Sequence, residues 1–380
     1  MATQEDSDKA MQAEMQAQIE SLQEELEKIR NPEQKGESIL CEALKGAQIN
    51  MPPTTALKLR RSLLGHFGKV YCLAWSATGK NIVSAAQDGK LIVWNAMYQH
   101  KLYVVTLNSS WVMTCGYSPD GIHVASGGLD NNCTVYQLGD RKYVQSAVLR
   151  GHDGYLSSCK FKSKDQVITS SGDKTCILWN LAEGRSRMER KFVGHKSDVT
   201  ATAIDSSSSN LFVSGSGDQT AKLWDVRQDD CVMTFRDSKS DVNCADFMNG
   251  GNAFATGAED GKTRIYDVRT YRTIASFTVG EGHTSSTSRQ HNGGPRGPLN
   301  CTAVAFSKTG RFIFSGYDDG NCRVWNTLCG DPKNYKDACV DVLGGHMSRV
   351  SCVAVEPEEG KALATADWGK QWEAHVRIWA

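Results

Sequence analysis

The chain has 380 residues, in which 43 lysines and arginines balance 43 aspartates and glutamates, so the formal net charge is zero. This balance argues against a nucleic-acid partner, which would need a basic face. The 13 cysteines are odd in number and scattered, without the paired spacing of a zinc site, which indicates free thiols in a reducing compartment and no bound metal. The start, MATQEDSDKA, is acidic and no apolar run of 18 residues occurs, so we expect neither a secretory signal nor a membrane span.

Residues 1–31 are predicted to form a helix, because they are rich in Gln, Glu, Ala, Met and Leu and contain no Gly or Pro before Pro32. The apolar positions, spaced 4, 3, 4 and 3 apart as in a coiled-coil seam, are Met15, Ile19, Leu22, Leu26 and Ile29. Such a narrow seam suits a partner helix better than a broad core. A helix packed on its own domain, or a disordered tail, is the alternative. Residues 32–56, with Pro52 and Pro53, are expected to be a connector.

Residues 57–380 carry a repeat in which an Asp stands six positions before an aromatic residue. The copies are Asp88–Trp94, Asp130–Tyr136, Asp173–Trp179, Asp218–Trp224, Asp260–Tyr266, Asp319–Trp325 and, with Glu in the Asp position, Glu373–Trp379. Successive copies are 42, 43, 45, 42, 59 and 54 residues apart. A period of about 40–45 residues that ends in Trp-Asp or Trp-Asn is typical of a β-propeller blade of four strands. Seven copies therefore predict an all-β, seven-bladed propeller.

The two ends of the propeller are predicted to close the ring together. The first repeat suggests strands over 70–76, 81–85, 91–94 and 101–106. The last repeat stops directly after its third strand, whereas residues 57–64 (LKLRRSLL) form an extra strand before the first repeat. This extra strand would complete the last blade and leave no open sheet edge.

A buried polar network repeats in register with the Asp. A Gly-His pair opens four repeats, at Gly65-His66, Gly151-His152, Gly194-His195 and Gly345-His346. With the hydroxyl four residues before the Asp, three sets result: His66, Ser84, Asp88 and Trp94; His152, Thr169, Asp173 and Trp179; His195, Ser214, Asp218 and Trp224. Ser, His and Asp together could suggest a hydrolase triad, but one enzyme does not need three copies. Each set satisfies its own hydrogen bonds, so we interpret all three as structural.

Several segments resemble the beta subunit of heterotrimeric G proteins, and the resemblance extends over roughly residues 10–380. They include GHFGKVYCLAW at 65–75, SAAQDGKLIVWN at 84–95, SSWVMTCGYSPDG at 109–121 and SGYDDGNCRVWN at 315–326. The resemblance implies a WD-repeat propeller whose N-terminal helix pairs with an obligate gamma subunit in a parallel coiled coil. It further implies that the dimer binds a GDP-loaded alpha subunit and, when released, signals to effectors downstream of membrane receptors.

Residues just before each Asp, and at the start of each inner strand, are expected to project to one end of the disc. They are Lys69, Tyr71, Trp111, Met113, Leu129, Asn131, Tyr155, Asp198, Asp241, Asn243, Glu259 and Trp372. Aromatic and Met anchors ringed by charge are typical of an interaction hot spot. The resemblance implies that this face binds the alpha subunit and effectors. It also implies that a side surface contacts the alpha subunit's N-terminal helix through Phe67, Lys90, Ile92 and Lys101.

Three places depart from the family pattern. The fifth blade has Asp237-Ser238 in place of Gly-His, so it loses one satisfying His. Residues 280–298, rich in Ser, Gly and Pro, predict a flexible loop between the fifth and sixth blades, with an effect on partner choice or none. In the last blade, counting back from Trp379 places Trp372 on the face, with Trp368 as the alternative. Glu373 in the Asp position puts that blade's network in doubt.

No catalytic site, cofactor site or phosphate-binding loop is evident, so we expect no enzyme activity and no GTP binding by this chain. Membrane attachment would be indirect, through lipidated partners, which predicts the cytoplasmic face of the plasma membrane and the cytoplasm. One alternative is a stand-alone WD-repeat scaffold for signalling complexes, resembling the receptor for activated C kinase, but that class lacks the heptad helix. Another is an enzyme in the central channel, which would need an acid/base set unique to one blade.

Overall fold

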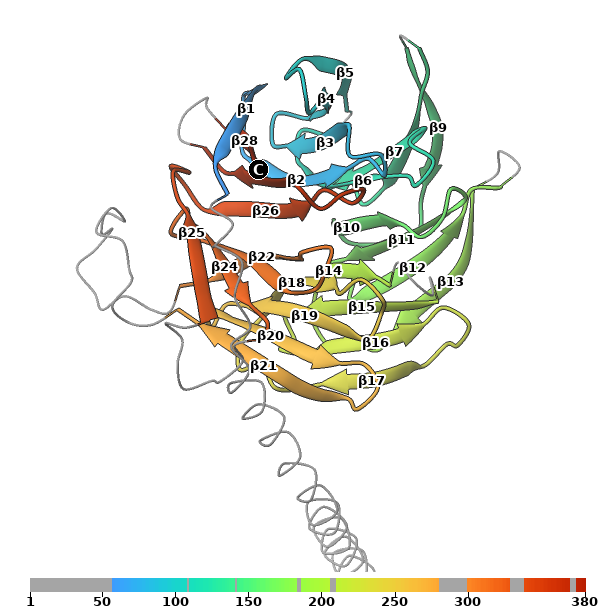
Figure 1. Ribbon diagram of the computed structural model, residues 1–380. Helices are drawn as coiled ribbons and strands as arrows, with labels where there is room; N and C mark the ends of the chain where they lie inside the picture. The colour runs from blue at the N-terminus through green and yellow to red at the C-terminus, as the bar shows by residue number, and fades with distance from the viewer. Residues whose placement is uncertain are drawn as a thin grey trace, which may run out of the picture. The chain divides into compact units, whose positions relative to one another are not determined.

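The computed structural model describes residues 57–380 apart from positions 108, 141, 183–185, 206–209, 280–298, 329–337 and 370–373. Within these residues, 28 strands form seven antiparallel four-stranded sheets (Figure 1). The prediction of an all-β, seven-bladed propeller is therefore confirmed.

Each of the first six blades consists of four strands that follow one another along the chain, from the innermost outward. Blades one to three contain β2 (Val70–Trp75), β3 (Asn81–Ala86), β4 (Lys90–Asn95), β5 (Lys101–Thr106), β6 (Val112–Tyr117), β7 (His123–Gly128), β8 (Cys133–Leu138), β9 (Tyr143–Leu149), β10 (Leu156–Phe161), β11 (Gln166–Ser171), β12 (Thr175–Asn180) and β13 (Arg187–Val193). Blades four to six contain β14 (Val199–Ile204), β15 (Leu211–Ser216), β16 (Ala221–Asp225), β17 (Cys231–Phe235), β18 (Val242–Phe247), β19 (Ala253–Ala258), β20 (Lys262–Asp267), β21 (Arg272–Thr278), β22 (Cys301–Phe306), β23 (Phe312–Tyr317), β24 (Cys322–Asn326) and β25 (Cys339–Leu343). Blade seven contains β26 (Val350–Val355), β27 (Leu363–Asp367), β28 (Ala374–Trp379) and β1 (Leu59–His66).

The innermost strands form a closed ring around the centre of the propeller. Each contacts the next in the order β2, β6, β10, β14, β18, β22 and β26, and β26 contacts β2 again. The predicted closure is confirmed, because β1 pairs antiparallel with β28 and completes the seventh blade, with Leu63 opposite Val376.

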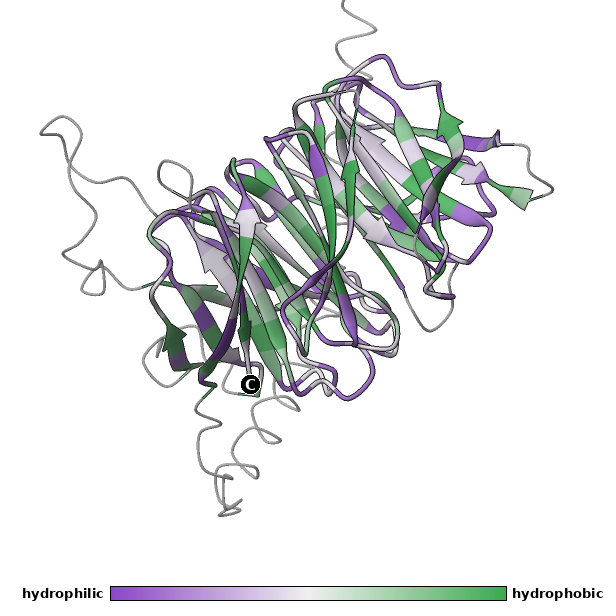
Figure 2. Ribbon diagram, turned by 90° about the horizontal axis from the view of Figure 1, so that it is seen from above, coloured by the Kyte–Doolittle hydropathy of each residue, from purple (hydrophilic) through white to green (hydrophobic). Residues whose placement is uncertain are grey.

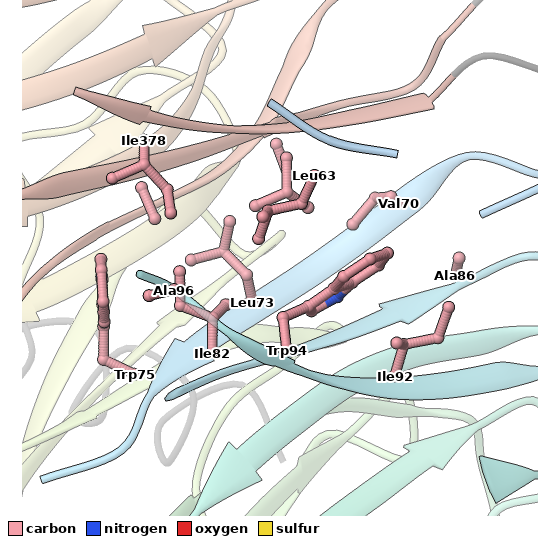
Figure 3. Packing of buried hydrophobic residues seen from close by; sticks show 13 residues of the cluster. Leu63, Val70, Leu73, Trp75, Ile82, Ala86, Ile92, Trp94, Ala96 and Ile378 are labelled. Atoms are coloured by element: carbon pink, nitrogen blue, oxygen red, sulfur yellow. The ribbon is translucent and has the colours of Figure 1, made fainter. Parts of the chain in front are cut away.

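Neighbouring blades cover both faces of each sheet, which explains why most residues of the second and third strands are buried rather than alternately buried and exposed. The cluster between the first and last blades shows this packing (Figure 3): Leu63 from β1 and Ile378 from β28 are buried in one cluster with Trp94 and Ile82 of blade one. Figure 2 shows hydrophobic residues concentrated in the strands and hydrophilic residues in many connecting loops. The blade interfaces are therefore the core of the molecule.

Some predictions fall outside the described residues and stay predictions. They are the helix over 1–31 with its seam (Met15, Ile19, Leu22, Leu26 and Ile29), the connector over 32–56 and the loop over 280–298. Among the helices of the described part of the chain, none has the length and apolar character needed to cross a bilayer.

The repeated polar network is a chain of hydrogen bonds that begins at the Trp. In blade one, Trp94 Nε1 donates to Ser84 Oγ at 2.8 Å, and His66 Nε2 lies 2.7 Å from the same oxygen. His66 Nδ1 lies 3.1 Å from Asp88, which also accepts the backbone N–H groups of Phe67 and Lys90. Burial raises the pKa of Asp88, but these donors outweigh it and hold the pKa below its usual value. The same network joins His152, Thr169, Asp173 and Trp179 in blade three, and His195, Ser214, Asp218 and Trp224 in blade four.

Blade seven builds this network with a carboxylate that the sequence analysis did not assign. His346 Nδ1 lies 2.9 Å from Asp367, and Thr365 Oγ1 accepts Trp379 Nε1 at 2.9 Å. Asp367 also accepts the backbone N–H of His375, as Asp88 accepts that of Lys90. The expectation of a weakened network is therefore wrong, because the last strand residue of β27 supplies the carboxylate and Glu373 is not needed.

Blades five and six use arginine where blades one, three, four and seven use histidine. Arg264 donates from both terminal nitrogens to Asp260, four residues earlier in blade five. Arg323 does the same to Asp319 in blade six, at 2.7 and 3.3 Å, with both side chains almost fully buried. Blade five thus lacks the histidine, as expected from Asp237-Ser238, and Arg264 takes its place as the partner of Asp260.

Candidate protein-binding face

One end of the propeller is built from two positions in each blade that a backbone hydrogen bond holds side by side. The residue before the Asp position donates its N–H to the carbonyl of the residue before the inner strand. The seven pairs are Gln87–Lys69, Leu129–Trp111, Gly172–Tyr155, Gly217–Asp198, Glu259–Asp241, Asp318–Asn300 and Trp368–Arg349. We call the end formed by these fourteen residues, with the adjoining second residues of the inner strands, the ring face.

The seventh pair corrects the prediction for the last blade. Val350 pairs with Asp367 as Val70 pairs with Ala86 in blade one, so the next residue, Trp368, occupies the position of Gln87. Counting back from Trp379 to Trp372 is wrong, because residues 370–373 are additional residues between β27 and β28. Trp372 itself lies outside the described residues.

Three aromatic side chains from blades seven, one and two meet at the centre of the ring face. The Tyr71 ring centroid lies 5.6 Å from that of Trp368 and 6.4 Å from that of Trp111, which is 42% exposed. The Lys69 ammonium lies 4.6 Å from the Trp368 ring centroid, and the Arg349 guanidinium lies 4.3 Å from it. We call Trp368, Tyr71 and Trp111 the aromatic line. The two cations hold the Trp368 ring by cation–π attraction. Trp111 is the most exposed residue of the aromatic line.

Apolar surface continues beside Trp111. Leu129, its backbone partner, is 50% exposed, whereas Met113 is half-buried. A hollow of about 30 Å³ next to Trp111 is lined in part by Ser109 and Asp130. It has room for roughly one water molecule, far less than a nucleotide needs. The chemistry available here is that of a protein contact.

The opposite half of the ring face is acidic. Tyr155 donates its hydroxyl to Asp198 at 2.9 Å, and burial together with that carboxylate raises the pKa of Tyr155 to about 12. Asp241 and Asp198 are half-buried, and Glu259 is exposed. Burial lowers the pKa of Arg349, but the carboxylates of Asp318 and Glu259 oppose this shift, so the guanidinium stays charged. The face therefore presents cations around the aromatic line and carboxylates across the ring.

Side-chain hydrogen bonds between neighbouring inner strands, which we call latches, explain the position of the aromatic line. In five blades, the second residue of the inner strand donates a side-chain hydrogen bond to the carbonyl of the first residue of the next inner strand. The pairs are Ser157–Val199, Thr200–Val242, Asn243–Cys301, Thr302–Val350 and Ser351–Val70. Blades one and two have Tyr71 and Met113 at this position. Their larger side chains belong to the ring face, whereas Asn243, predicted as a binding residue, uses its amide as a latch.

Asn131 follows Asp130 in a tight turn of blade two. Its φ of 61° lies in the left-handed region, which Asn tolerates better than most residues. This position therefore has a conformational role in addition to its place on the ring face.

The side surface predicted on blade one is present in part. Phe67 is 59% exposed and the Lys90 ammonium lies 5.3 Å from its ring centroid. Lys101 donates to the carbonyl of Gly65 and lies 5.4 Å from the Trp94 ring centroid. Ile92, however, is 0% exposed, so its assignment to a surface is wrong. Blade seven and the rest of blade one enclose it in the same cluster as Trp94.

Sequence reasoning missed Arg349 and the latch hydroxyls. Arg349 stands directly before β26, as Lys69 stands before β2, so its position was available as a signal. The hydroxyls at the second position of the inner strands were also visible in the repeat. Among the residues that the structure describes, no group of His, Cys, Asp and Glu side chains could hold a metal ion.

Comparisons with known proteins agree with this architecture. Residues 13–380 match the family model described as G protein beta WD-40 repeat protein. The chain is 41% identical over 342 residues to a guanine nucleotide-binding protein subunit beta of Arabidopsis thaliana, covering 86% of this chain and 84% of the relative. It is 39% identical over 337 residues to the protein of the same name from Oryza sativa subsp. japonica, and 41% identical over 337 residues to that from Solanum tuberosum. Coverage is again 86% of this chain and 84% of each relative.

Proposed function

The chain belongs to the G protein beta WD-40 repeat family, whose members are propeller scaffolds rather than enzymes, and we propose that it binds a GDP-loaded alpha subunit through the ring face. The observation that carries the proposal is the aromatic line, in which Trp111 stays exposed while Trp368 is fixed between two cations. Rigid aromatic anchors with charged surroundings are the usual source of binding energy in an interface. Lys69 and Arg349 would meet acidic groups of the partner, and Asp198, Asp241 and Glu259 basic ones.

Competition for the ring face would turn this binding into a signal. The same aromatic line would contact effectors, so a bound alpha subunit masks them, and nucleotide exchange on the alpha subunit releases the face. Coupling between the two sites is reciprocal, because any ligand that favours the GDP state of the alpha subunit must also favour the assembled trimer. The family identity supports alpha and gamma subunits as partners in general.

A gamma subunit would be the obligate partner of the predicted helix. Its coiled coil would use the seam from Met15 to Ile29, and its lipid would hold the dimer at the cytoplasmic face of the plasma membrane. Phe67, Lys90 and Lys101 would contact the alpha subunit's N-terminal helix at the side of blade one. Residues 280–298 would vary this partner choice or have no effect on it.

Truncation of Trp111 tests the ring face. We expect Trp111→Ala to weaken binding of a GDP-loaded alpha subunit by about 2 kcal/mol or more, roughly thirtyfold in Kd, as hot-spot truncations do. Isothermal titration with the purified beta-gamma dimer measures it, and an unchanged melting temperature shows that the propeller is intact. Tyr98→Ala is the control, since Tyr98 is an exposed aromatic residue in the β4–β5 turn at the other end of the disc. Equal affinities for wild type and Trp111→Ala would contradict the proposal.

Substitution in the seam tests the coiled coil separately. Leu22→Glu places a charge at a central a/d position and is expected to abolish co-purification with a small helical, lipidated subunit of roughly 70 residues. Glu24→Gln, outside the seam, is expected to leave co-purification intact. A chain that is stable and monomeric without any partner would instead favour the stand-alone scaffold.

A further inference from the structure

Two thiols on the inner strands of the first and last blades converge on one backbone atom. Cys72 is the third residue of β2 and Cys352 the third residue of β26, and these strands are neighbours in the ring. Cys72 Sγ lies 3.8 Å and Cys352 Sγ 3.6 Å from the carbonyl oxygen of Leu73. The pair therefore lies at the boundary where the propeller closes.

Exposure separates this pair from the other thiols nearby. Cys72 and Cys352 are both half-buried, whereas Cys115, which hydrogen-bonds Cys72, is 0% exposed. A second thiol pair, Cys244 and Cys301 between blades five and six, is buried on both sides. Small oxidants reach thiols that solvent reaches, so the ring-closure pair is the accessible one.

We propose that Cys72 and Cys352 form a reversible disulfide when the protein meets a hydroperoxide, and that this bond ties the first blade to the last. The bond would close a loop that spans most of the propeller, and cross-links over long loops stabilise most in the chain-entropy description. It would also lie one residue from Tyr71, in the middle of the aromatic line.

The chemistry balances with hydrogen peroxide as the two-electron oxidant. The Cys72 thiolate attacks one peroxide oxygen, the O–O bond breaks, and the departing hydroxide takes a proton to form water. The sulfur of Cys352 then attacks the sulfur of the Cys72 sulfenic acid, which forms the S–S bond and breaks the S–O bond, and the departing hydroxide takes the Cys352 proton to form the second water. Each sulfur loses one electron and peroxide gains two.

The surroundings assign the attacking role to Cys72. Hydrogen bonds from the Cys115 and Cys352 thiols, aided by the Lys160 ammonium, hold the pKa of Cys72 well below its usual range despite burial. The pKa of Cys352 is raised instead, mainly by its hydrogen bond to Cys72 and by burial. An S–S bond of roughly 2 Å needs the two sulfurs, which now both lie on the Leu73 carbonyl, to rotate toward each other, with the strands moving as far as the bond geometry demands.

Peptide mapping of the peroxide-treated full chain, purified with its partner subunit, tests the disulfide. After a brief exposure to hydrogen peroxide, free thiols are alkylated at acidic pH and the digest is analysed by mass spectrometry. We expect a Cys72–Cys352 linked peptide as the first cross-link, reversed by dithiothreitol, together with a higher melting temperature of the oxidised protein. Cys72→Ser should slow the loss of the Cys352 thiol by about tenfold, because the attacking thiolate is gone.

Two further variants guard the interpretation. In Cys352→Ser the reaction should stop at a Cys72 sulfenic acid that dimedone traps, which shows the order of the steps even if the melting temperature changes. Cys231→Ser removes a similarly half-buried thiol on the outer strand β17 and should leave the linked peptide unchanged. Absence of the linked peptide overturns the proposal, as does oxidation of Cys244 and Cys301 at the same rate. Alpha-subunit binding plays no part in this test, so its outcome is independent of the proposed function.

Discussion

Blades one, three, four and seven solve the same structural problem as blades five and six with different chemistry. Each must hold a carboxylate at the turn between its second and third strands. In the first group a buried His links the carboxylate to a buried hydroxyl and a Trp N–H; in the second an Arg pairs with it directly. Blade two uses neither, and its Asp130 is exposed. The difference teaches that the repeat conserves the geometry of the turn while the partner of the carboxylate is replaceable.

The largest effect is expected from removing the buried arginine of blade six. Arg323→Ala leaves the carboxylate of Asp319, 1% exposed, without its charged partner, and breaking a buried ion pair on one side costs about 3–5 kcal/mol. Urea unfolding followed by tryptophan fluorescence measures the loss. Lys361→Ala is the control, because Lys361 pairs with Glu359 where both side chains are exposed, so its loss should lower stability far less. Similar losses for the two variants would show that blade six does not depend on its buried pair.

The next largest loss of stability is expected at equivalent serines in blades one and six. Ser84→Ala in blade one removes the common partner of His66 and Trp94, which leaves two buried ring nitrogens unsatisfied and should cost about 2–3 kcal/mol. Ser315 occupies the equivalent position in blade six and hydrogen-bonds Thr263. Ser315→Ala should cost about 1 kcal/mol, as the loss of one neutral hydrogen bond does. Equal costs in the same urea titration would mean that the His network adds nothing to the hydroxyl.

The smallest effect is the pH dependence that the buried histidines contribute. Burial lowers the pKa of His152, His195 and His346 below 6.5, although the neighbouring aspartates oppose it. A group whose pKa is lower in the folded state contributes stability above its unfolded pKa and loses it as the pH falls through the folded pKa. The histidines should therefore lower the urea midpoint between pH 7 and pH 5, whereas buried Asp246, whose pKa burial raises to about 6, changes it in the opposite direction. Asp218, with a pKa lowered to about 2, and the arginines keep their charge throughout this window.

His195→Asn isolates one share of this pH dependence. An Asn can still donate to Asp218 but does not titrate, so the decrease of the midpoint should become shallower. His100→Asn removes an exposed histidine and should leave the slope as in the wild type. Equal slopes for the wild type and His195→Asn between pH 7 and pH 5 would contradict the assignment of a neutral buried His195.

The sequence was a reliable guide wherever the evidence was local. The six-residue spacing placed the networks of His66, His152 and His195, because every member lies at a fixed position in one blade. Asp367 was missed because additional residues between β27 and β28 break that spacing. The carboxylate of this blade comes from the last residue of β27 and not from the usual position in the turn. Arg264 and Arg323 were readable in principle, as each follows its Asp by four residues in a blade without Gly-His.

Contacts between distant segments could not be read in this way. Trp368 and Tyr71 lie near opposite ends of the propeller's sequence, in the last and the first blade. They meet only because the ring closes. Ile92 was assigned with Phe67 and Lys90 to a side surface of blade one by its position in the chain, but neighbouring blades cover its strand and bury it. Periodicity describes a blade well, whereas what lies against a blade depends on the whole ring.

The pairing of β1 with β28 has a consequence for how the protein is made. The first strand of the propeller has no hydrogen-bonding neighbour until the last strand, which ends at Trp379, has left the ribosome. Six blades can form during synthesis, but β1 waits with an unpaired edge while the rest of the chain is translated. Such an edge invites pairing with other chains. The protein is therefore most in need of protection by the cell while β1 is still unpaired, and not after the ring has closed.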